Sequence, residues 1–229
     1  MPPGMRRRRF IQREENSPVQ GYGMTMEERG QVTGLTKGRV EALTDGIFAF
    51  AMTLLVTTLD FPNSTTTLPP ITVSSLVSLY TPDLLHYVIA FAVLAGFWVT
   101  HHIQFHYIQA MDRTALWTNI TCLLFVALVP FTTALAGDYP DSPLAAMVFE
   151  VNLLIIGLLI LLIWNYATVG RRLVEKTLDE KVVILHTRRS LIIPVISVIG
   201  ILLALAGSTW STAVYLLSVP FILAIKRYS

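Results

Sequence analysis

The chain has 229 residues, of which 53% are hydrophobic and only 14% are charged, with a formal net charge of +2 at pH 7. Soluble globular domains carry about 25% charged residues, so this composition argues against such a domain and favours a protein embedded in a lipid bilayer. Its single cysteine, Cys122, excludes an internal disulfide.

The first 38 residues form a polar segment with glycine, proline and no hydrophobic periodicity. Such a segment cannot bury enough apolar surface to fold alone, so we expect a flexible tail. Its "RRRR" run is not followed closely by a short apolar segment and a small-residue cleavage site, which argues against a signal peptide.

Six apolar segments follow, and each approaches the roughly 20 residues that a membrane-spanning helix needs. The last two are short and are separated by "GSTW", which predicts a tight helical hairpin. The predicted fold class is therefore an all-α integral membrane protein, in which residues 39–229 form one six-helix domain. The predicted spans are 42–60, 84–107, 115–136, 144–168, 190–207 and 209–225.

Basic residues are confined to alternate connections between these spans. They precede the first span, lie between the second and third and between the fourth and fifth, and follow the sixth. The other two long connections contain acids but no lysine or arginine. Cytoplasmic flanks are enriched in Lys and Arg, so we expect a multi-pass protein of the cell membrane with both termini in the cytoplasm. The positive charge then reflects membrane orientation, not nucleic-acid binding.

Polar residues within spans usually face the interior of a helix bundle and are candidates for function. Three groups fall on the cytoplasmic side of the predicted topology, where they could meet. They are Arg39, Thr44 and Asp45 in the first span; Trp98, His101, His102, His106 and Asp112 at the end of the second; and Asn119 in the third, ahead of Pro130.

His102 and His106 have the spacing of two zinc ligands on one helix face, but no third ligand is evident, so hydrogen-bonded structural histidines are favoured. The sequence shows no Ser-His-Asp order, Gly-rich phosphate loop or paired carboxylates within the spans. We therefore expect neither an enzyme nor a cofactor. Asp45 beside Arg39 favours a structural ion pair, although a proton relay through Asp45 stays open.

The first span carries Phe50, Thr53, Leu54 and Thr57 at spacings i, i+3, i+4 and i+7, which places them on one helical face. The spacing alone favours a packing face against neighbouring helices. A pore-lining face would have the same pattern, with a narrow hydrophobic constriction and a few hydroxyl groups.

Three motifs resemble those of the transmembrane protein 175 family of lysosomal potassium channels and their prokaryotic homologues. "RVEALTDG" resembles that family's Arg-x-x-x-Phe-Ser-Asp motif, "WVTHHIQF" its Trp-x-x-His-x-x-x-Phe motif, and "NITCLLFVALVPFTTAL" its third helix. The resemblance covers about residues 39–136 and is specific in combination. The last three spans agree only in number and hydropathy.

The resemblance implies a homotetrameric potassium channel whose pore is lined by the first helix of each subunit. It assigns pore constriction and selectivity to Phe50, Thr53, Leu54 and Thr57. It assigns a structural network at the helix 1 motif to Arg39, Thr44, Asp45, Gly46, Trp98, His101 and Asn119. Leu43 and Thr44 depart from the motif Phe and Ser, and Phe50 is bulkier than the family's usual Ile or Leu.

The partners expected on this interpretation are potassium ions, the lipid bilayer and identical subunits. One alternative is a small proton-coupled transporter using Asp45 and His101. Transporters often have broken helices in corresponding halves, whereas Pro130, Pro194 and Pro220 do not pair between halves, which favours a channel. Another alternative is a membrane-embedded subunit of a larger complex.

Overall fold

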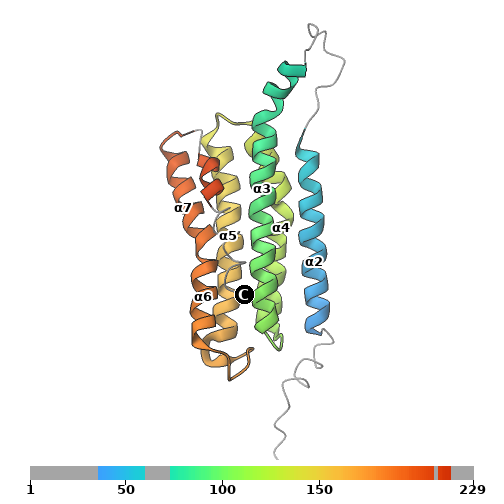
Figure 1. Cartoon of the computed structure of the whole chain (residues 1–229), viewed down its shortest axis with the longest axis vertical. Coiled ribbons are helices and arrows are strands. Elements are labelled where there is room, and N and C mark those ends of the chain that lie inside the picture. The colour runs from blue at the N-terminus through green and yellow to red at the C-terminus, as the bar shows by residue number, and fades with distance from the viewer. Residues whose placement is uncertain (1–35, 60–72, 209–210, 218–229) are drawn as a thin grey trace, which may run out of the picture.

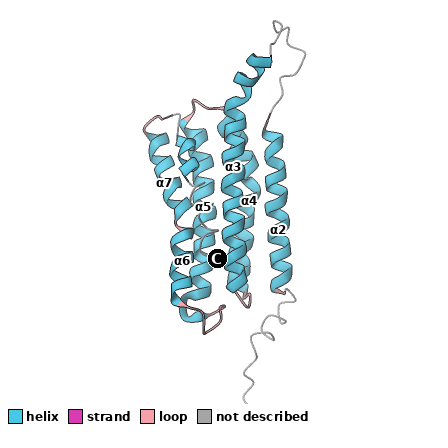
Figure 2. Cartoon of the chain, in the orientation of Figure 1, coloured by secondary structure: helices cyan, strands magenta, loops and turns pink. Residues whose placement is uncertain are grey.

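The computed structural model describes residues 36–59, 73–208 and 211–217, and every regular element in these ranges is helical (Figure 2). The long helices run side by side as a bundle, with α2 at one edge (Figure 1). The elements are α2 (Lys37–Leu54), η1 (Leu55–Thr58), α3 (Val73–Tyr107), α4 (Arg113–Asp138), α5 (Pro143–Thr168), η2 (Val169–Arg171), α6 (Glu180–Ser190), α7 (Ile192–Leu205) and η3 (Ser211–Leu217).

Five helical segments in the described ranges are long and apolar enough to cross a membrane. They correspond to the first five spans predicted from the sequence, so the all-helical membrane class is confirmed. These segments are Lys37–Thr58, Asp83–Tyr107, Arg113–Asp138, Pro143–Arg171 and Glu180–Leu205.

Two predicted boundaries are wrong. The second helix begins at Val73, so residues 73–83, expected in a connection, are helical. The fifth span was expected at 190–207, but α6 begins at Glu180 and continues into α7 through Leu191, whose backbone angles stay in the right-handed helical region. Asp179 starts α6 because its carboxylate accepts a hydrogen bond from the backbone N–H of Lys181 at 2.9 Å, an N-cap that hydropathy does not reveal.

The predicted sixth span, 209–225, lies largely outside the described residues. Its described part, Ser211–Leu217, is a 3₁₀ helix that packs on α7 and also contacts α3 and α5. A further difference concerns Asp112, which was grouped with the second span. It is instead the N-cap of α4, where its carboxylate accepts from the N–H of Ala115 at 2.8 Å and from the Tyr166 hydroxyl at 2.6 Å.

The bundle is held together by close apolar packing between α2, α3, α4, α5 and α7. Phe48, Leu94, Val126 and Ile156 are fully buried in the main cluster. Helices α5 and α7 approach closely at Gly157, where an added Cβ would lie 2.7 Å from the Pro194 ring. Small residues permit such contacts in membranes, where the gain comes from van der Waals packing.

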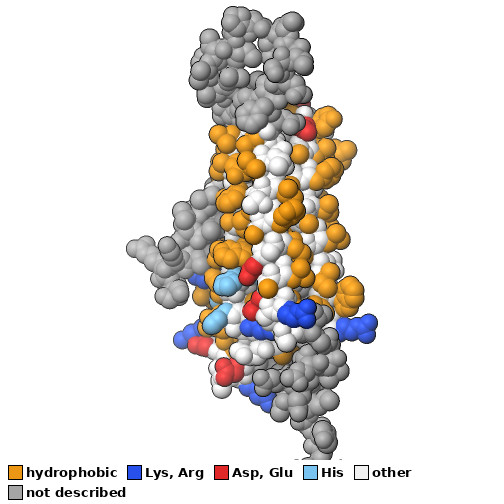
Figure 3. All heavy atoms as spheres, turned by 90° about the vertical axis from the view of Figure 1, so that its right-hand side faces the viewer, with side chains coloured by type: hydrophobic (Ala, Val, Ile, Leu, Met, Phe, Trp, Pro, Cys, Tyr) orange, Lys and Arg blue, Asp and Glu red, His pale blue; other side chains and the backbone are white. Residues whose placement is uncertain are grey.

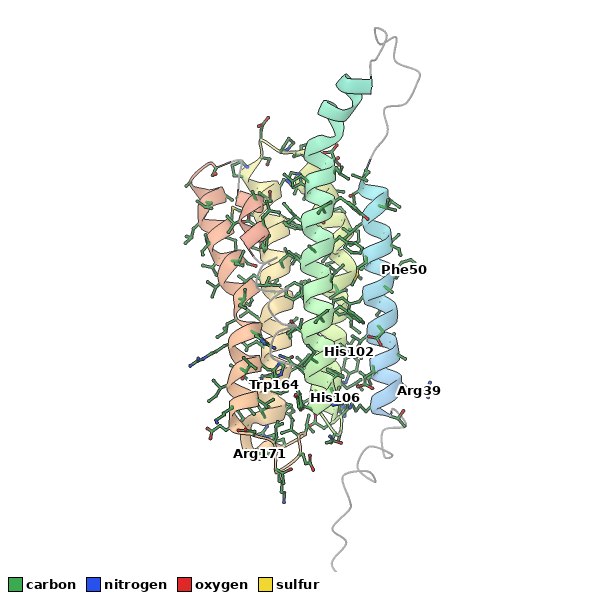
Figure 4. All side chains as sticks on the ribbon, in the orientation of Figure 1. Arg39, Phe50, His102, His106, Trp164 and Arg171 are labelled. Atoms are coloured by element: carbon green, nitrogen blue, oxygen red, sulfur yellow. The ribbon has the colours of Figure 1, made fainter. Side chains whose placement is uncertain are left out.

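The two ends of the bundle differ in charge. The described Lys and Arg residues lie at the start of α2 and α4, after α5, and on α6, and we call this the basic end. Figure 3 shows lysine and arginine gathered in the lower part of one face, and Arg39 and Arg171 lie at this end in Figure 4. The far end carries Asp83, Asp138 and Asp141 and, among the described residues, no Lys or Arg.

Candidate functional site

Helix α2 packs against the bundle with one face only. Val40, Thr44, Phe48 and Ala51 are buried on this face, spaced at three and four residues as a helical stripe requires. They contact α3 and α4, which are the neighbours of α2 at the edge of the bundle. Size alone does not select this face, since the small Thr44 and Ala51 are buried while the larger Leu43 and Phe50 are exposed.

The opposite face of α2 is not covered by the described part of the chain. Phe50 is 64% exposed, and its side chain points away from the bundle (Figure 4). Thr53 and Thr57 are also exposed, whereas Leu54 is half-buried. Gly46 lies on this face too, and a Cβ added there would meet no atom within 4 Å. Four of the sequence-predicted residues therefore share a free surface, with Leu54 at its margin.

The hydroxyl groups on this face are oriented by the helix backbone. Thr53 donates to the carbonyl of Phe50 at 2.8 Å, and Thr57 donates to the carbonyl of Leu54 at 2.7 Å. A hydroxyl that donates its proton keeps its oxygen lone pairs as acceptors. Both threonines thus present oxygen atoms that can interact with a cation.

A buried hydrogen-bonded chain links three helices behind this face. Nε2 of His101 on α3 lies 2.8 Å from Oδ1 of Asn119 on α4, and because an amide oxygen only accepts, the imidazole donates. The Asn119 amide then donates to the Thr44 hydroxyl on α2 at 3.0 Å, and Thr44 donates to the Val40 carbonyl. His101 also stacks on Phe105 with ring centroids 4.0 Å apart.

Asp45 makes a separate contact. The Trp98 indole donates to its carboxylate at 2.9 Å, and the bond is exposed. The structural ion pair between Arg39 and Asp45, favoured from the sequence, is not formed within the described part of the chain. Arg39 is exposed, and the salt bridge found on α2 joins Lys37 to Glu41 at 3.4 Å. The two residues are six apart, which places them on different sides of the helix.

The histidines do not form a metal centre in the described residues, where no group of three potential ligands is found. His102 and His106 are exposed, and His102 stacks on Trp98 at 5.5 Å (Figure 4). Asp45 and His101 hydrogen-bond to different partners, not to each other.

Two buried polar residues of α5 were overlooked in the sequence. Glu150 is fully buried, and Asn152 donates to the Phe125 carbonyl of α4 at 3.2 Å. The signal was present, since "FEVN" interrupts the most apolar of the predicted spans. Gln104 was also missed, because the neighbouring histidines are the more obvious candidates in the sequence. Its side chain is buried and donates to the Ser190 hydroxyl at 2.6 Å.

Comparison of the sequence with known proteins identifies the family to which it is related. The model of the endosomal/lysosomal potassium channel TMEM175 matches residues 39–130, a range that includes every residue assigned above to the pore face and to the network. A potassium channel of Chamaesiphon minutus is 35% identical over 146 residues, covering 62% of this chain and 71% of that protein. A potassium channel of Streptomyces collinus is 32% identical over 146 residues, covering 62% and 69%.

Animal relatives match over a shorter range. The human endosomal/lysosomal proton channel TMEM175 is 30% identical over 81 residues, which is 35% of this chain and 16% of that protein.

The fold also has a solved counterpart. The crystal structure of a lysosomal potassium-selective channel TMEM175 homologue from Chamaesiphon minutus superposes with a TM-score of 0.72 at 29% identity, covering 84% of this chain and 98% of that one. The chain therefore belongs to the TMEM175 family, whose members are ion channels and not enzymes.

Proposed function

We propose that this protein is a potassium-permeable channel formed by four identical subunits, with ions passing along a central path lined by α2. Each subunit would span the cell membrane six times, the last time through residues 209–225. The residues that precede α2 would form a cytoplasmic tail, and the basic end of the bundle would face the cytoplasm, in keeping with the distribution of Lys and Arg.

The observation that carries this proposal is the uncovered face of α2. A helix at the edge of a bundle contacts either lipid or another subunit. This face combines exposed apolar side chains with Thr53, Thr57 and the backbone at Gly46. Small residues favour close approach of helices in membranes, and hydroxyl oxygens can replace part of the water around an ion.

The constriction is assigned to Phe50. Four phenyl rings at one level would exclude water, and such a dry constriction resists ions without any opposing charge. Thr53, one turn further along, would offer the nearest oxygen atoms, with Leu54 and Thr57 beyond it. The network through His101, Asn119 and Thr44, and the bond from Trp98 to Asp45, would fix the angle at which α2 meets the central axis.

Ion flux through purified protein in liposomes tests this function. Potassium, sodium and proton gradients should be compared, since the human relative is a proton channel by name. We expect potassium flux that exceeds sodium flux and needs no second gradient. Potassium flux that requires a proton gradient would favour the coupled transporter. No ion flux at all through assembled protein would favour a subunit of a larger complex.

Phe50→Ala tests the pore assignment directly. Because Phe50 is mostly exposed within a subunit, its truncation should leave the subunit fold nearly unchanged. We expect flux per tetramer to rise and potassium-to-sodium discrimination to fall. Thr53→Val, which keeps the shape and removes the oxygen, should lower discrimination with less effect on conductance. Unchanged selectivity in both variants, with flux at or below the parent level, would contradict the assignment of α2 to the ion path.

A further inference from the structure

The carboxyl group of Glu150 has no role in the proposed ion path, because it lies on α5, away from the free face of α2. Its side chain is fully buried, and neither carboxyl oxygen has a hydrogen-bond partner of good geometry among the described residues. The Ser211 hydroxyl of η3 lies close by without completing such a bond. Buried carboxyl groups are usually paired, so an unpaired one calls for a ligand or a proton.

The carboxyl group packs against α7 at Gly200, where the absence of a side chain leaves room for it. A Cβ on Gly200 would lie 2.8 Å from both the carboxyl carbon and Oε1 of Glu150, and 3.1 Å from Oε2. Any larger residue at this position would displace the acid. Helix α7 and η3 thus close over Glu150 as a tight lining.

A small pocket lies at the far end of the bundle, and Glu150 is not part of its wall but lies beside one residue that is, Ser211. Its volume is about 30 Å³, which is enough for a water molecule. Ala146 lines the pocket one helical turn before Glu150 on α5, and Ser211 both lines the pocket and lies beside the carboxyl group. His86 and Thr212 form another part of the wall, with Nε2 and Oγ1 3.1 Å apart.

The surroundings favour a proton over a metal ion. A potassium ion must replace its water shell with several oxygen atoms, and the contact with Gly200 leaves no space for such a shell. A proton needs a single carboxyl oxygen and no added volume. It also removes the charge, whose burial without a partner would be costly.

We propose that Glu150 is a proton-binding site, filled from the far-end pocket past Ser211, and that the proton-bound acid holds α7 and η3 against α5. The other titratable groups around this position are Tyr215, whose hydroxyl donates to Ser197 at 2.9 Å, His86 on α3, and Asp141 at the pocket mouth. Helix α7 carries no titratable side chain, and those of α4 are near its ends or at Cys122. Loss of the proton would place a bare charge at the α5–α7 contact and loosen it.

Infrared spectroscopy of the purified full-length protein tests the site. A protonated carboxyl group has a carbonyl stretch distinct from that of a carboxylate. We expect this band at neutral pH in the parent, its loss in Glu150→Gln, and its retention in the control Asp141→Asn, which alters an exposed acid at the pocket mouth. Transfer to D₂O should shift the band, since the pocket admits water. A band that Glu150→Gln leaves unchanged would overturn the site, and a band insensitive to D₂O would overturn the route.

The pH dependence of thermal denaturation gives an independent readout. An unfolded chain ionises glutamate above about pH 4.3, whereas the folded chain keeps this proton, so the folded state binds more protons and loses stability as pH rises. Glu150→Gln carries no ionisable group, so its denaturation midpoint relative to the parent should increase as pH is raised. For Asp141→Asn, the difference in midpoint from the parent should not increase as pH is raised. A constant difference for Glu150→Gln would contradict the proposal.

If Glu150→Gln does not assemble, Glu150→Asp is the variant to measure, because it retains the carboxyl group on a shorter side chain. The carbonyl band should then move in frequency while the protein stays folded, which still assigns it to position 150. An unmoved band in a folded Glu150→Asp protein would overturn the site.

Discussion

Asn119 is the residue on which the link between three helices depends, because its amide joins His101 of α3 to Thr44 of α2. Asn119→Ala would leave the imidazole N–H buried without an acceptor, which costs about 1–3 kcal/mol. Thr44 would be less affected, since it still donates to Val40. We expect a lower midpoint of thermal denaturation in detergent.

Thr121→Ala is the matched control for that measurement. It lies on the same helix, but its hydroxyl is exposed and donates only to the Trp117 carbonyl of its own helix. Its midpoint should stay close to that of the parent. Equal losses in both variants would mean that the buried chain contributes no specific stability.

The polar members of this site could be named from their position within apolar spans, and the charge pattern put them on one side of the membrane. Only the resemblance of three motifs joined them into one network. Their pairing could not be derived. Arg39 and Asp45 are close in sequence and opposite in charge, yet helix geometry separates them, and Asp45 instead meets an indole 53 residues away. Glu150 could have been found, because a lone acid in an apolar span is a signal in itself.

At the scale of a single helix, the free face of α2 allows assembly to be separated from folding. Gly46→Leu meets open space within the subunit, and replacing glycine inside a helix is favourable by up to about 1 kcal/mol. The isolated subunit should therefore be at least as stable as the parent. If the proposed tetramer brings the α2 helices of neighbouring subunits close together here, the added side chain should reduce the tetramer fraction in size-exclusion chromatography with light scattering.

Gly38→Leu controls for the change in helix propensity. Gly38 also lies on α2 with nothing within 4 Å of an added Cβ, but it is two turns nearer the start of the helix. We expect it to leave assembly intact. A tetramer fraction that Gly46→Leu does not reduce would argue against close contact at this level.

The existence and order of the first five helices followed from hydropathy, because lipid requires long apolar segments with all backbone groups paired. The positions of the helix ends did not follow from hydropathy, because they depend on capping residues and on packing outside the apolar segments. Asp179 extends the fifth span toward the basic end, and Val73 begins α3 in a stretch that contains Pro82 and looks like a loop. Residues 211–217 form a 3₁₀ helix where an α-helix was predicted.

For the whole molecule, the segregation of charge predicts sidedness. Asp141→Cys and Lys176→Cys place thiols at exposed positions on the far and basic ends. In sealed vesicles of known orientation, a membrane-impermeant maleimide should label the two from opposite sides, position 176 from the cytoplasmic side. Cys122 is fully buried and should stay unlabelled in the parent, which serves as the control. Labelling of both positions from one side would refute this topology.

The hydrogen bond between Thr44 and Asn119 also bears on how the chain is made. The two residues are 75 positions apart, so α2 leaves the ribosome well before α4 exists to receive it. At about 5–20 residues per second, the delay is roughly 4–15 s. During this interval the nascent first helix has its threonine and aspartate in the membrane without Asn119 or Trp98, and it can be retained at the insertion machinery until α3 and α4 arrive.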